Sequence, residues 1–258
     1  MHLIIPAYNE EARLPTTLAS LVAYASADPT HCGRLHVVVV DNASTDRTAE
    51  VARSFDCAAL PVTVVRCDTP GKGAAVRAGV LSTDADVVGF MDADGATDLS
   101  AIAMGLTLIE GGADVAIGSR AVDGSLTMVR HSRLREIGAT VYRRQTVRIA
   151  PGIADTQCGF KIMRGDVARR VFASLRCTGF SFDVEILGRA QRMGARIAEF
   201  PVVWVDVPGS TFRPGRHGIA AFWELARIGW LLGAHRAVLE LPSAIVEPVV
   251  VLNGVSES

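Results

Sequence analysis

Short apolar segments that alternate with longer amphipathic ones restrict the fold of this chain more than any other feature. The short segments are rich in Val and Ile, lack hydrophobic–polar alternation, and span residues 3–6, 35–40, 62–65, 86–91 and 114–118. Such strands are typically buried on both faces of a sheet. Helical patterns cover 10–25, a stretch capped by Ser44 or Thr45 that runs to about 54, and a stretch opening at Gly71. This alternation predicts an α/β fold with a doubly wound, mostly parallel sheet.

The chain is long enough for one sizeable domain. It has 258 residues, of which 49% are hydrophobic. We expect this domain to span 1–235. We expect 236–258 to be a tail that adds either an edge strand, at 249–252, or an oligomer contact.

Composition excludes several functional classes. The net charge of −1 provides no basic field for nucleic acid. The five cysteines lack C-x-x-C spacing, so neither a zinc site nor a disulfide framework is indicated. We expect no leader before the first strand, and no apolar run approaches the length of a membrane span. We therefore expect a cytoplasmic protein.

Polar residues follow these strands where the strands end. The carboxyl ends of parallel strands share one edge of a sheet, and ligands bind in the crevice beside it. The segments expected to meet there are 6–10, 41–46, 71–73 and 92–98. Their convergence predicts a binding site.

Asp92 and Asp94 end the fourth strand and are separated by one residue. On an extended backbone, two such side chains point the same way. Paired carboxylates suit Mg²⁺ or Mn²⁺, which take oxygen ligands and leave positions for phosphate. The alternative is a solvated turn.

Two further strand ends suit a nucleotide. Gly71-Lys72-Gly73 leads into a helix, where free N–H groups and a cation would meet a diphosphate, although P-loop spacing is absent. The alternative is an ordinary βα turn with a solvated lysine. Asp41 is expected either to accept from a base or ribose, or to cap the next helix.

Four motifs, in this order and spacing, resemble those of family-2 glycosyltransferases with the GT-A fold, a Rossmann-like, mostly parallel sheet flanked by helices. They are Ile4-Ile5-Pro6-Ala7-Tyr8-Asn9-Glu10-Glu11, Val40-Asp41-Asn42-Ala43-Ser44-Thr45-Asp46, Gly71-Lys72-Gly73 and Asp92-Ala93-Asp94. A narrower similarity, covering about residues 3 to 232, is to dolichyl-phosphate β-glucosyltransferases, which are close to dolichyl-phosphate mannose synthases. It rests on the segments 92–97, 118–120, 155–161 (Asp-Thr-Gln-Cys-Gly-Phe-Lys), 182–185 and 209–210.

The resemblance implies roles for individual residues. Those expected to bind the nucleotide sugar are Pro6, Tyr8, Glu10, Asp41, Lys72, Gly73, Asp92, Ala93 and Asp94. Asp94 and Asp92 would hold Mg²⁺ or Mn²⁺, with Asp94 the more direct ligand. Arg120, Asp155 and Asp94 would act in catalysis, and Arg130, Arg133 and Gln157 would contact the acceptor. Ala96 stands where mannose synthases carry a further ligand, a Gln, which favours the glucosyl branch.

The resemblance implies an inverting, metal-dependent transfer of a hexose, best taken as glucose from UDP-glucose, to a polyprenyl phosphate. A phosphate acceptor is already ionised near pH 7 and needs no strong base. A soluble hydroxyl acceptor would need one, and Asp155 is the leading candidate; alternatively, Asp155 only forms a turn. A non-catalytic nucleotide-sugar-binding module is the alternative of another class.

The second half of the chain leaves more alternatives open. Residues 130–148 form an arginine-rich amphipathic pattern that suits an anionic membrane surface, a solvated helix or a homo-oligomer face. We expect a peripheral protein at the inner face of the membrane, with Trp223 and Trp230 of a helix at 219–234 at the interface. Residues 209–218 suit either a lid or a basic loop. Asp183 and Glu185 either close the acceptor side or cap a helix, and 202–205 should be a strand at or near the sheet edge.

Overall fold

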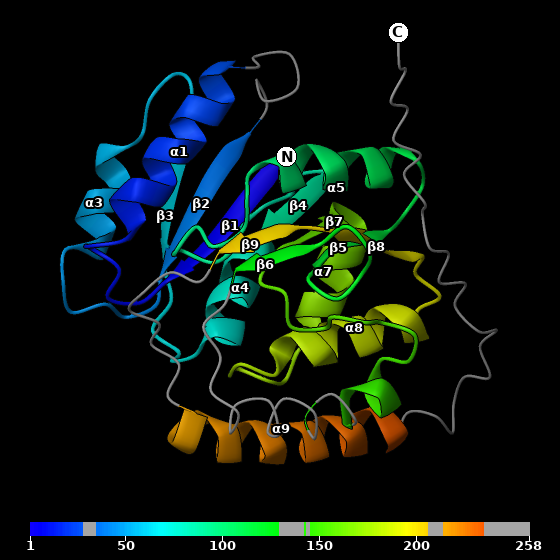
Figure 1. Ribbon diagram of the computed structural model, residues 1–258. Coiled ribbons are helices and arrows are strands. Elements are labelled where there is room, and N and C mark those ends of the chain that lie inside the picture. The colour runs from blue at the N-terminus through cyan, green and yellow to red at the C-terminus, as the bar shows by residue number, and fades with distance from the viewer. Residues whose placement is uncertain (28–34, 129–141, 143–144, 206–213, 235–258) are drawn as a thin grey trace, which may run out of the picture.

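The computed structural model describes residues 1–27, 35–128, 142, 145–205 and 214–234, the last range without the side chains of 214–220. In these residues helices cover both faces of a seven-stranded sheet (Figure 1). The strands of the sheet are β1 (His2–Ala7), β2 (His36–Asp41), β3 (Val62–Arg66), β4 (Val87–Phe90), β5 (Val115–Ser119), β7 (Lys161–Arg164) and β8 (Ile197–Pro201). The helices are α1 (Leu14–Ala27), α3 (Thr48–Ser54), α4 (Lys72–Leu81), α5 (Ser100–Glu110), α7 (Gly165–Ala173), α8 (Phe182–Arg192) and α9 (Pro214–Ala234).

The strand order is β3-β2-β1-β4-β7-β5-β8. All neighbouring strands are parallel except β7, which runs antiparallel to both β4 and β5. In the register, Lys161 at the start of β7 lies opposite Phe90 on one side and Ile117 on the other. The start of β7 therefore lies at the edge where β4 and β5 end. The predicted mostly parallel α/β fold is confirmed.

Alternate side chains of each strand supply two cores. Leu3 and Ile5 of β1 pack in the core on the side of α1, α3 and α5. Ile4 packs in the core on the other side, beneath α4, α7 and α8. Helix α9 packs on α8 and forms the outer boundary of this second layer (Figure 1). Because both faces are covered, the strands contain few polar residues.

Several expected boundaries were wrong for local reasons. The first helix begins at Leu14, not residue 10, because the N–H groups of Arg13 and Leu14 donate to the Glu10 carbonyl in a turn. Asp46, rather than Ser44 or Thr45, accepts the Thr48 N–H (2.9 Å) at the start of α3.

The strand expected at 202–205 is β9 (Val203–Val205), and it does not belong to the main sheet. It pairs in parallel with β6 (Leu126–Met128), and β8 forms the sheet edge instead. Pro201 ends β8, and the carbonyl of the next residue, Val202, accepts from the Leu126 N–H (3.2 Å). The chain thus leaves the main sheet at a residue that has no N–H group of its own.

The C-terminal part differs from expectation in one respect. Helix α9 begins at Pro214, so residues 214–218 of the expected lid are helical. The rest of that segment, most of the arginine-rich stretch 130–148, including Arg130 and Arg133, and the tail 236–258 lie outside the described residues. None of the described helices is both long and apolar enough to cross a membrane.

Candidate active site

The loops after β1 and β2 are tied together at the carboxyl edge of the sheet. The side-chain oxygen of Asn9 accepts from the Thr45 N–H (2.9 Å), and the hydroxyl of Ser44 accepts from the Asn9 N–H (3.1 Å). Asn9 and Ala43 both have left-handed backbones, with φ of 54° and 56°. Asn tolerates this conformation but Ala seldom adopts it, and such strain concentrates at functional sites.

Two acidic side chains are enclosed where these loops meet. Asp41 is 3% exposed and accepts from the Ser44 N–H (3.0 Å), with Arg66 3.6 Å away. Glu10 is 8% exposed and pairs with Arg13 (2.7 Å). Burial raises the pKa of Glu10, and Arg13 opposes this. Tyr8, by contrast, is 52% exposed, so a flat aromatic side chain lies at the mouth of the site.

Asn42 has a positioning role that the sequence analysis missed. Its side-chain oxygen accepts from the Gly71 N–H (2.9 Å), and its amide group donates to the carbonyls of Cys67 (3.0 Å) and Thr69 (2.7 Å). The end of β2 thereby fixes the turn that precedes α4. Its position next to Asp41, at the end of a strand, was the feature of the sequence from which this role could have been predicted.

The turn Gly71–Gly73, called the donor turn below after the role that the resemblance implies for it, leaves no room for side chains at its glycines. Gly71 has φ of +120°, and a Cβ there would lie 2.1 Å from the Thr178 carbonyl oxygen. A Cβ on Gly73 would lie 2.6 Å from the Cys177 carbonyl oxygen. The residues after Gly71 form the N-terminus of α4, where the helix dipole favours an anion, although the Ala74 N–H already donates to the Thr178 carbonyl.

Lys72 connects the donor turn to the acidic strand end. Its ammonium forms an ion pair with Asp92 and lies 5.9 Å from the centre of the Phe182 ring. Burial lowers the pKa of Lys72, but the charges of Asp92 and Asp183 outweigh this and raise it. Lys72 therefore remains a cation.

Asp94 lies beside this pair and accepts from the Ala96 N–H (3.1 Å). Burial, and then the negative charge of Asp92, raise its pKa. The carbonyl of Ala93, between the two aspartates, accepts from the Thr17 hydroxyl (2.7 Å), which fixes the turn. A Cβ on Gly159 would lie 2.1 Å from Oδ2 of Asp92, so the turn that contains Gly159 packs directly on this carboxylate.

These carboxylates suit a divalent cation whose coordination shell is completed mainly by water and by the oxygens of a bound phosphate ligand. No cluster of three or more His, Cys, Asp or Glu side chains within the described ranges is arranged to hold a metal ion by itself. Mg²⁺ is often bound by only one or two carboxylates, with water and phosphate oxygens completing its shell. A cation at Asp94 would also relieve the repulsion between Asp92 and Asp94 that raises the Asp94 pKa.

Arg120 and Asp155 form the second charged unit of the site. The guanidinium donates through Nε to Oδ2 (2.7 Å) and through Nη2 to Oδ1 (3.0 Å), and the Arg120 N–H also donates to Oδ2 (3.1 Å). The Gln157 N–H donates to Oδ1 (3.1 Å). Burial works to raise the pKa of Asp155, but Arg120 outweighs it and the pKa is lowered. The guanidinium also lies 5.5 Å from the Trp204 ring centre.

Glu199 of β8 anchors this turn, and the sequence analysis missed it. Its carboxylate accepts from the N–H groups of Ala154 (2.8 Å) and Asp155 (3.0 Å). Because Glu199 lies far along the chain from Asp155, no local sequence pattern predicts the contact between them. The turn that carries Asp155 and Gln157 is therefore fixed by both of its flanking strands, β5 and β8.

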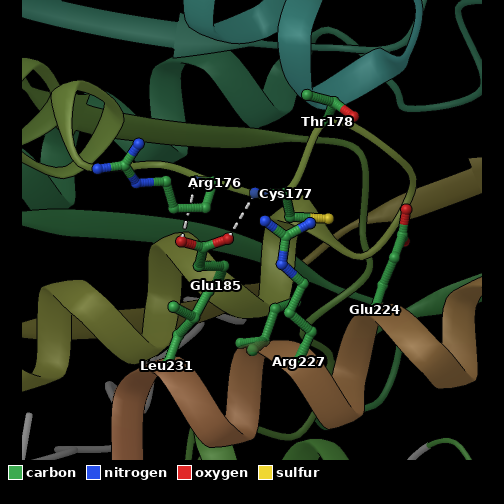
Figure 2. A pocket seen from close by; sticks show the side chains of 8 residues that line it. Arg176, Cys177, Thr178, Glu185, Glu224, Arg227 and Leu231 are labelled. Atoms are coloured by element: carbon green, nitrogen blue, oxygen red, sulfur yellow. Dashed lines mark hydrogen bonds between the residues drawn. The ribbon is translucent and has the colours of Figure 1, made fainter. Parts of the chain in front are cut away.

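Asp183 and Glu185, which the sequence analysis left open, have different surroundings. Asp183 pairs with Lys161 (2.6 Å), whose ammonium also donates to the Cys158 carbonyl (2.7 Å). Lys161 is fully buried, and burial raises the pKa of Asp183. Glu185 is also fully buried and accepts from the N–H groups of Arg176 (3.0 Å) and Cys177 (2.7 Å) (Figure 2). Glu185 thus holds the backbone of the loop that precedes α8.

The predicted residues divide into two groups in the structure. Pro6 lies in β1, Tyr8 and Glu10 follow it, and Asp41 ends β2. Lys72 and Gly73 belong to the donor turn, and Asp92, Ala93 and Asp94 follow β4. Arg120, Asp155 and Gln157 form the neighbouring unit at the ends of β5 and β7. Contact between Gly159 and Asp92 joins the two units.

Known proteins resemble this chain over most of its length. Residues 2–172 match glycosyl transferase family 2. The dolichyl-phosphate beta-glucosyltransferase of Mus musculus is 34% identical over 242 residues, covering 89% of this chain and 72% of that protein. That of Dictyostelium discoideum is 33% identical over 250 residues, covering 90% and 75%.

A solved structure shares the fold. Glucosyl-3-phosphoglycerate synthase from Mycobacterium tuberculosis, determined with Mn²⁺, UDP-glucose and phosphoglyceric acid, superposes with a TM-score of 0.65 at 18% identity. The match covers 89% of this chain and 79% of that one. From the family match and the curated relatives, the chain belongs to glycosyl transferase family 2 and is a glycosyltransferase with the GT-A fold.

Proposed function

We propose that this enzyme transfers glucose from UDP-glucose to the phosphate of a polyprenyl phosphate, with inversion at the anomeric carbon and with Mg²⁺ or Mn²⁺ bound. The curated relatives support the sugar and the acceptor by name. Family membership sets aside the non-catalytic alternative.

The observation that carries the acceptor class is the saturation of Asp155. Its two carboxylate oxygens accept four hydrogen bonds, from Arg120 N, Nε and Nη2 and from Gln157 N, and its pKa is lowered. A general base needs a free lone pair and a pKa near the working pH. Asp155 is therefore a poor base, and an acceptor that is already ionised fits the site better than a hydroxyl does.

The donor side is suited to bind a nucleoside diphosphate. Asp94, with Asp92, would hold the cation, which when bound offsets charge on the departing diphosphate. Lys72 and the N–H groups at the start of α4 orient and stabilise the phosphates. Asp41 and Glu10 are placed to accept from the base or ribose, and Tyr8 offers a stacking face at the rim.

Helix α9 suits an acceptor that resides in a lipid surface. Trp223 and Trp230 are 75% and 70% exposed and lie seven positions apart, on one face of the helix. The opposite face, with Leu225, Ile228 and Leu232, is buried against the domain. Exposed Trp side chains favour the membrane–water interface. We infer peripheral binding through this face.

A transfer assay tests the proposed acceptor. Purified protein is given UDP-glucose and Mn²⁺ with a short-chain polyprenyl phosphate, the free polyprenol, or a panel of soluble sugars. Glucosylation of the phosphate alone is expected. Product from only the soluble hydroxyl compounds, together with no retention on liposomes at low salt, would overturn the lipid acceptor.

The donor base is tested by thermal stability. A ligand that binds only the folded protein raises the unfolding temperature. UDP with Mn²⁺ should raise it more than GDP at equal concentration. A larger shift with GDP would assign the enzyme to guanosine-linked donors instead.

A further inference from the structure

A loop at 176–181 lies between the donor turn and α9. On its inner side, the Thr178 carbonyl accepts from the Ala74 N–H (3.2 Å) in the first turn of α4. The hypothetical Cβ atoms on Gly71 and Gly73 clash with the Thr178 and Cys177 carbonyls at 2.1 and 2.6 Å. Backbone therefore packs on backbone here, and a displacement of the loop must move the donor turn or open a gap beside it.

The outer side of the same loop is held by one side chain of α9. Oε2 of Glu224 accepts from the Ser181 N–H (3.1 Å). Its other oxygen occupies the space beside Gly179, where an added Cβ would lie only 1.9 Å from Oε1. The Ser181 hydroxyl donates to the Ala221 carbonyl (3.3 Å), one turn earlier in α9. Figure 2 shows Glu224 reaching from α9 toward this loop.

The loop is also fixed at its start. Glu185 of α8 accepts the Arg176 and Cys177 N–H groups, so the two ends of the loop are held by carboxylates from different helices. Glu185 is itself paired with Arg189 of its own helix (2.6 Å). Glu224 is thus a side-chain link, beside the backbone link at Ala221, between the helix with the exposed tryptophans and the loop behind the donor turn.

We propose that Glu224 is a positioning residue for donor binding: it holds the loop 176–181 against the donor turn, so that Lys72 and the α4 N-terminus keep the geometry that the diphosphate requires. This inference rests on the proposed nucleoside diphosphate site. Glu224 does not touch the donor and acts only through the loop.

The test compares Glu224→Ala with Glu224→Gln. The amide oxygen of Gln can still accept from the Ser181 N–H and fills nearly the same volume. The Ala variant should raise the Kd of UDP with Mn²⁺ and the KM of the donor about tenfold, since small displacements of positioning groups have effects of this order or larger. The Gln variant should stay within about threefold of wild type, and the acceptor KM should change little in both.

Arg227→Gln is the matched control, because Arg227 lines the same small pocket on α9 but is not among the residues that hold the loop. Its UDP affinity should equal that of wild type. Gly179→Ala provides a second route, since its Cβ would displace the Glu224 carboxylate from its position beside the loop. It should weaken UDP binding similarly, and combining it with Glu224→Ala should add little, because both remove the same contact.

The outcomes separate the two proposals. If wild-type protein does not bind UDP, the donor assignment itself fails. If wild type binds UDP and Glu224→Ala binds it within about threefold while melting at a lower temperature, Glu224 is only structural. If Glu224→Ala does not fold, Gly179→Ala and Glu224→Gln decide: unchanged UDP affinity in Gly179→Ala overturns the inference.

Discussion

Asp94 and Asp155 are both partly buried carboxylates at the same edge of one sheet, but their surroundings differ. Asp94 accepts a backbone N–H, and burial and then the negative charge of Asp92 raise its pKa, although Lys72 and Arg13 oppose this. Asp155 accepts hydrogen bonds from the Arg120 guanidinium and from further N–H groups, so its pKa is lowered. The positive charges near Asp94 do not offset its burial and the charge of Asp92, whereas Arg120 more than offsets the burial of Asp155.

This difference assigns the two carboxylates to different tasks. A carboxylate whose charge is poorly compensated favours the arrival of a cation. A carboxylate already saturated by a bidentate arginine holds that arginine in place and is not available to take a proton. Under the proposed function, the donor side of the site is thus electrostatically incomplete without its ligand, whereas the carboxylate of Asp155 is saturated before any ligand binds.

The largest expected effect comes from removing the charge of Asp94. Asp94→Asn should lower turnover by roughly 10²- to 10³-fold, the usual loss for one preorganised electrostatic contact. It should not lower the unfolding temperature, because the raised pKa shows that the charge is unfavourable in the folded protein. Steady-state kinetics and thermal melts measure both.

Asp123→Asn, at an exposed carboxylate in the turn before β6, is the control and should behave as wild type. Full activity of Asp94→Asn after EDTA treatment would contradict the metal role.

A smaller effect is expected from a substitution at Gly159, where the group of residues around Asp155 touches the group around Asp92. In Gly159→Ala the new Cβ would lie 2.1 Å from Oδ2 of Asp92, so this carboxylate must rotate away or the turn must shift. Donor binding should weaken about tenfold, because a displaced ligand group misplaces the diphosphate. Titration of UDP in the presence of Mn²⁺ measures this.

Gly229→Ala in α9 is a suitable control, since an added Cβ meets nothing within 4 Å. Equal UDP affinity in Gly159→Ala and wild type would show that the contact between the two units does not affect the donor site.

The smallest effect concerns stability and pH at Asp155. Asp155→Asn should cost about 1–3 kcal/mol at neutral pH, since it leaves partly buried donors of Arg120 poorly satisfied. The folded-state pKa of Asp155 is lowered, so its stabilising contribution is present above the unfolded-state pKa of about 3.9 and is lost as pH falls through the folded value. The stability gap between wild type and Asp155→Asn should thus be constant near neutrality and narrow in acid.

Denaturant unfolding at a series of pH values measures this gap. A gap that widened as the pH fell would mean that the Asp155 pKa is raised, and Asp155 would again become a candidate base.

The sequence alone predicted the parallel part of the fold and the meeting of its strand ends. Those strands are apolar throughout, and their polar ends stand directly after them in the chain. It did not predict β7, because a buried Lys161 begins this short strand and its charge is compensated by Asp183, a residue of another element. Strand β8 was missed for a similar reason, since it contains Glu199, whose partners lie on a distant turn.

The same limit applied to the site. The positions of Asp92, Asp94 and Lys72 at strand and helix ends could be predicted from local pattern. Their partners could not, because the ion pair between Lys72 and Asp92 and the hydrogen bonds between Arg120 and Asp155 join segments far apart in the chain. Whether Asp155 can act as a base depends on the groups that donate hydrogen bonds to it, and only the three-dimensional structure shows which groups these are.

The reversed direction of β7 has a consequence for how such an enzyme can diversify. Because β7 enters the sheet at the edge where β4 and β5 end, the turn with Asp155 precedes its strand, while Asp92 and Asp94 follow theirs. Strands β1, β2 and β4, whose ends carry the proposed donor residues, all precede the segment between Arg120 and Asp155 in the chain, although Tyr142 and Ile149 of that segment belong to the core beneath α8. Under the proposed function, acceptor preference is thus separable in sequence from the donor residues, and chimeras that swap this segment between relatives together with its core contacts should keep their donor.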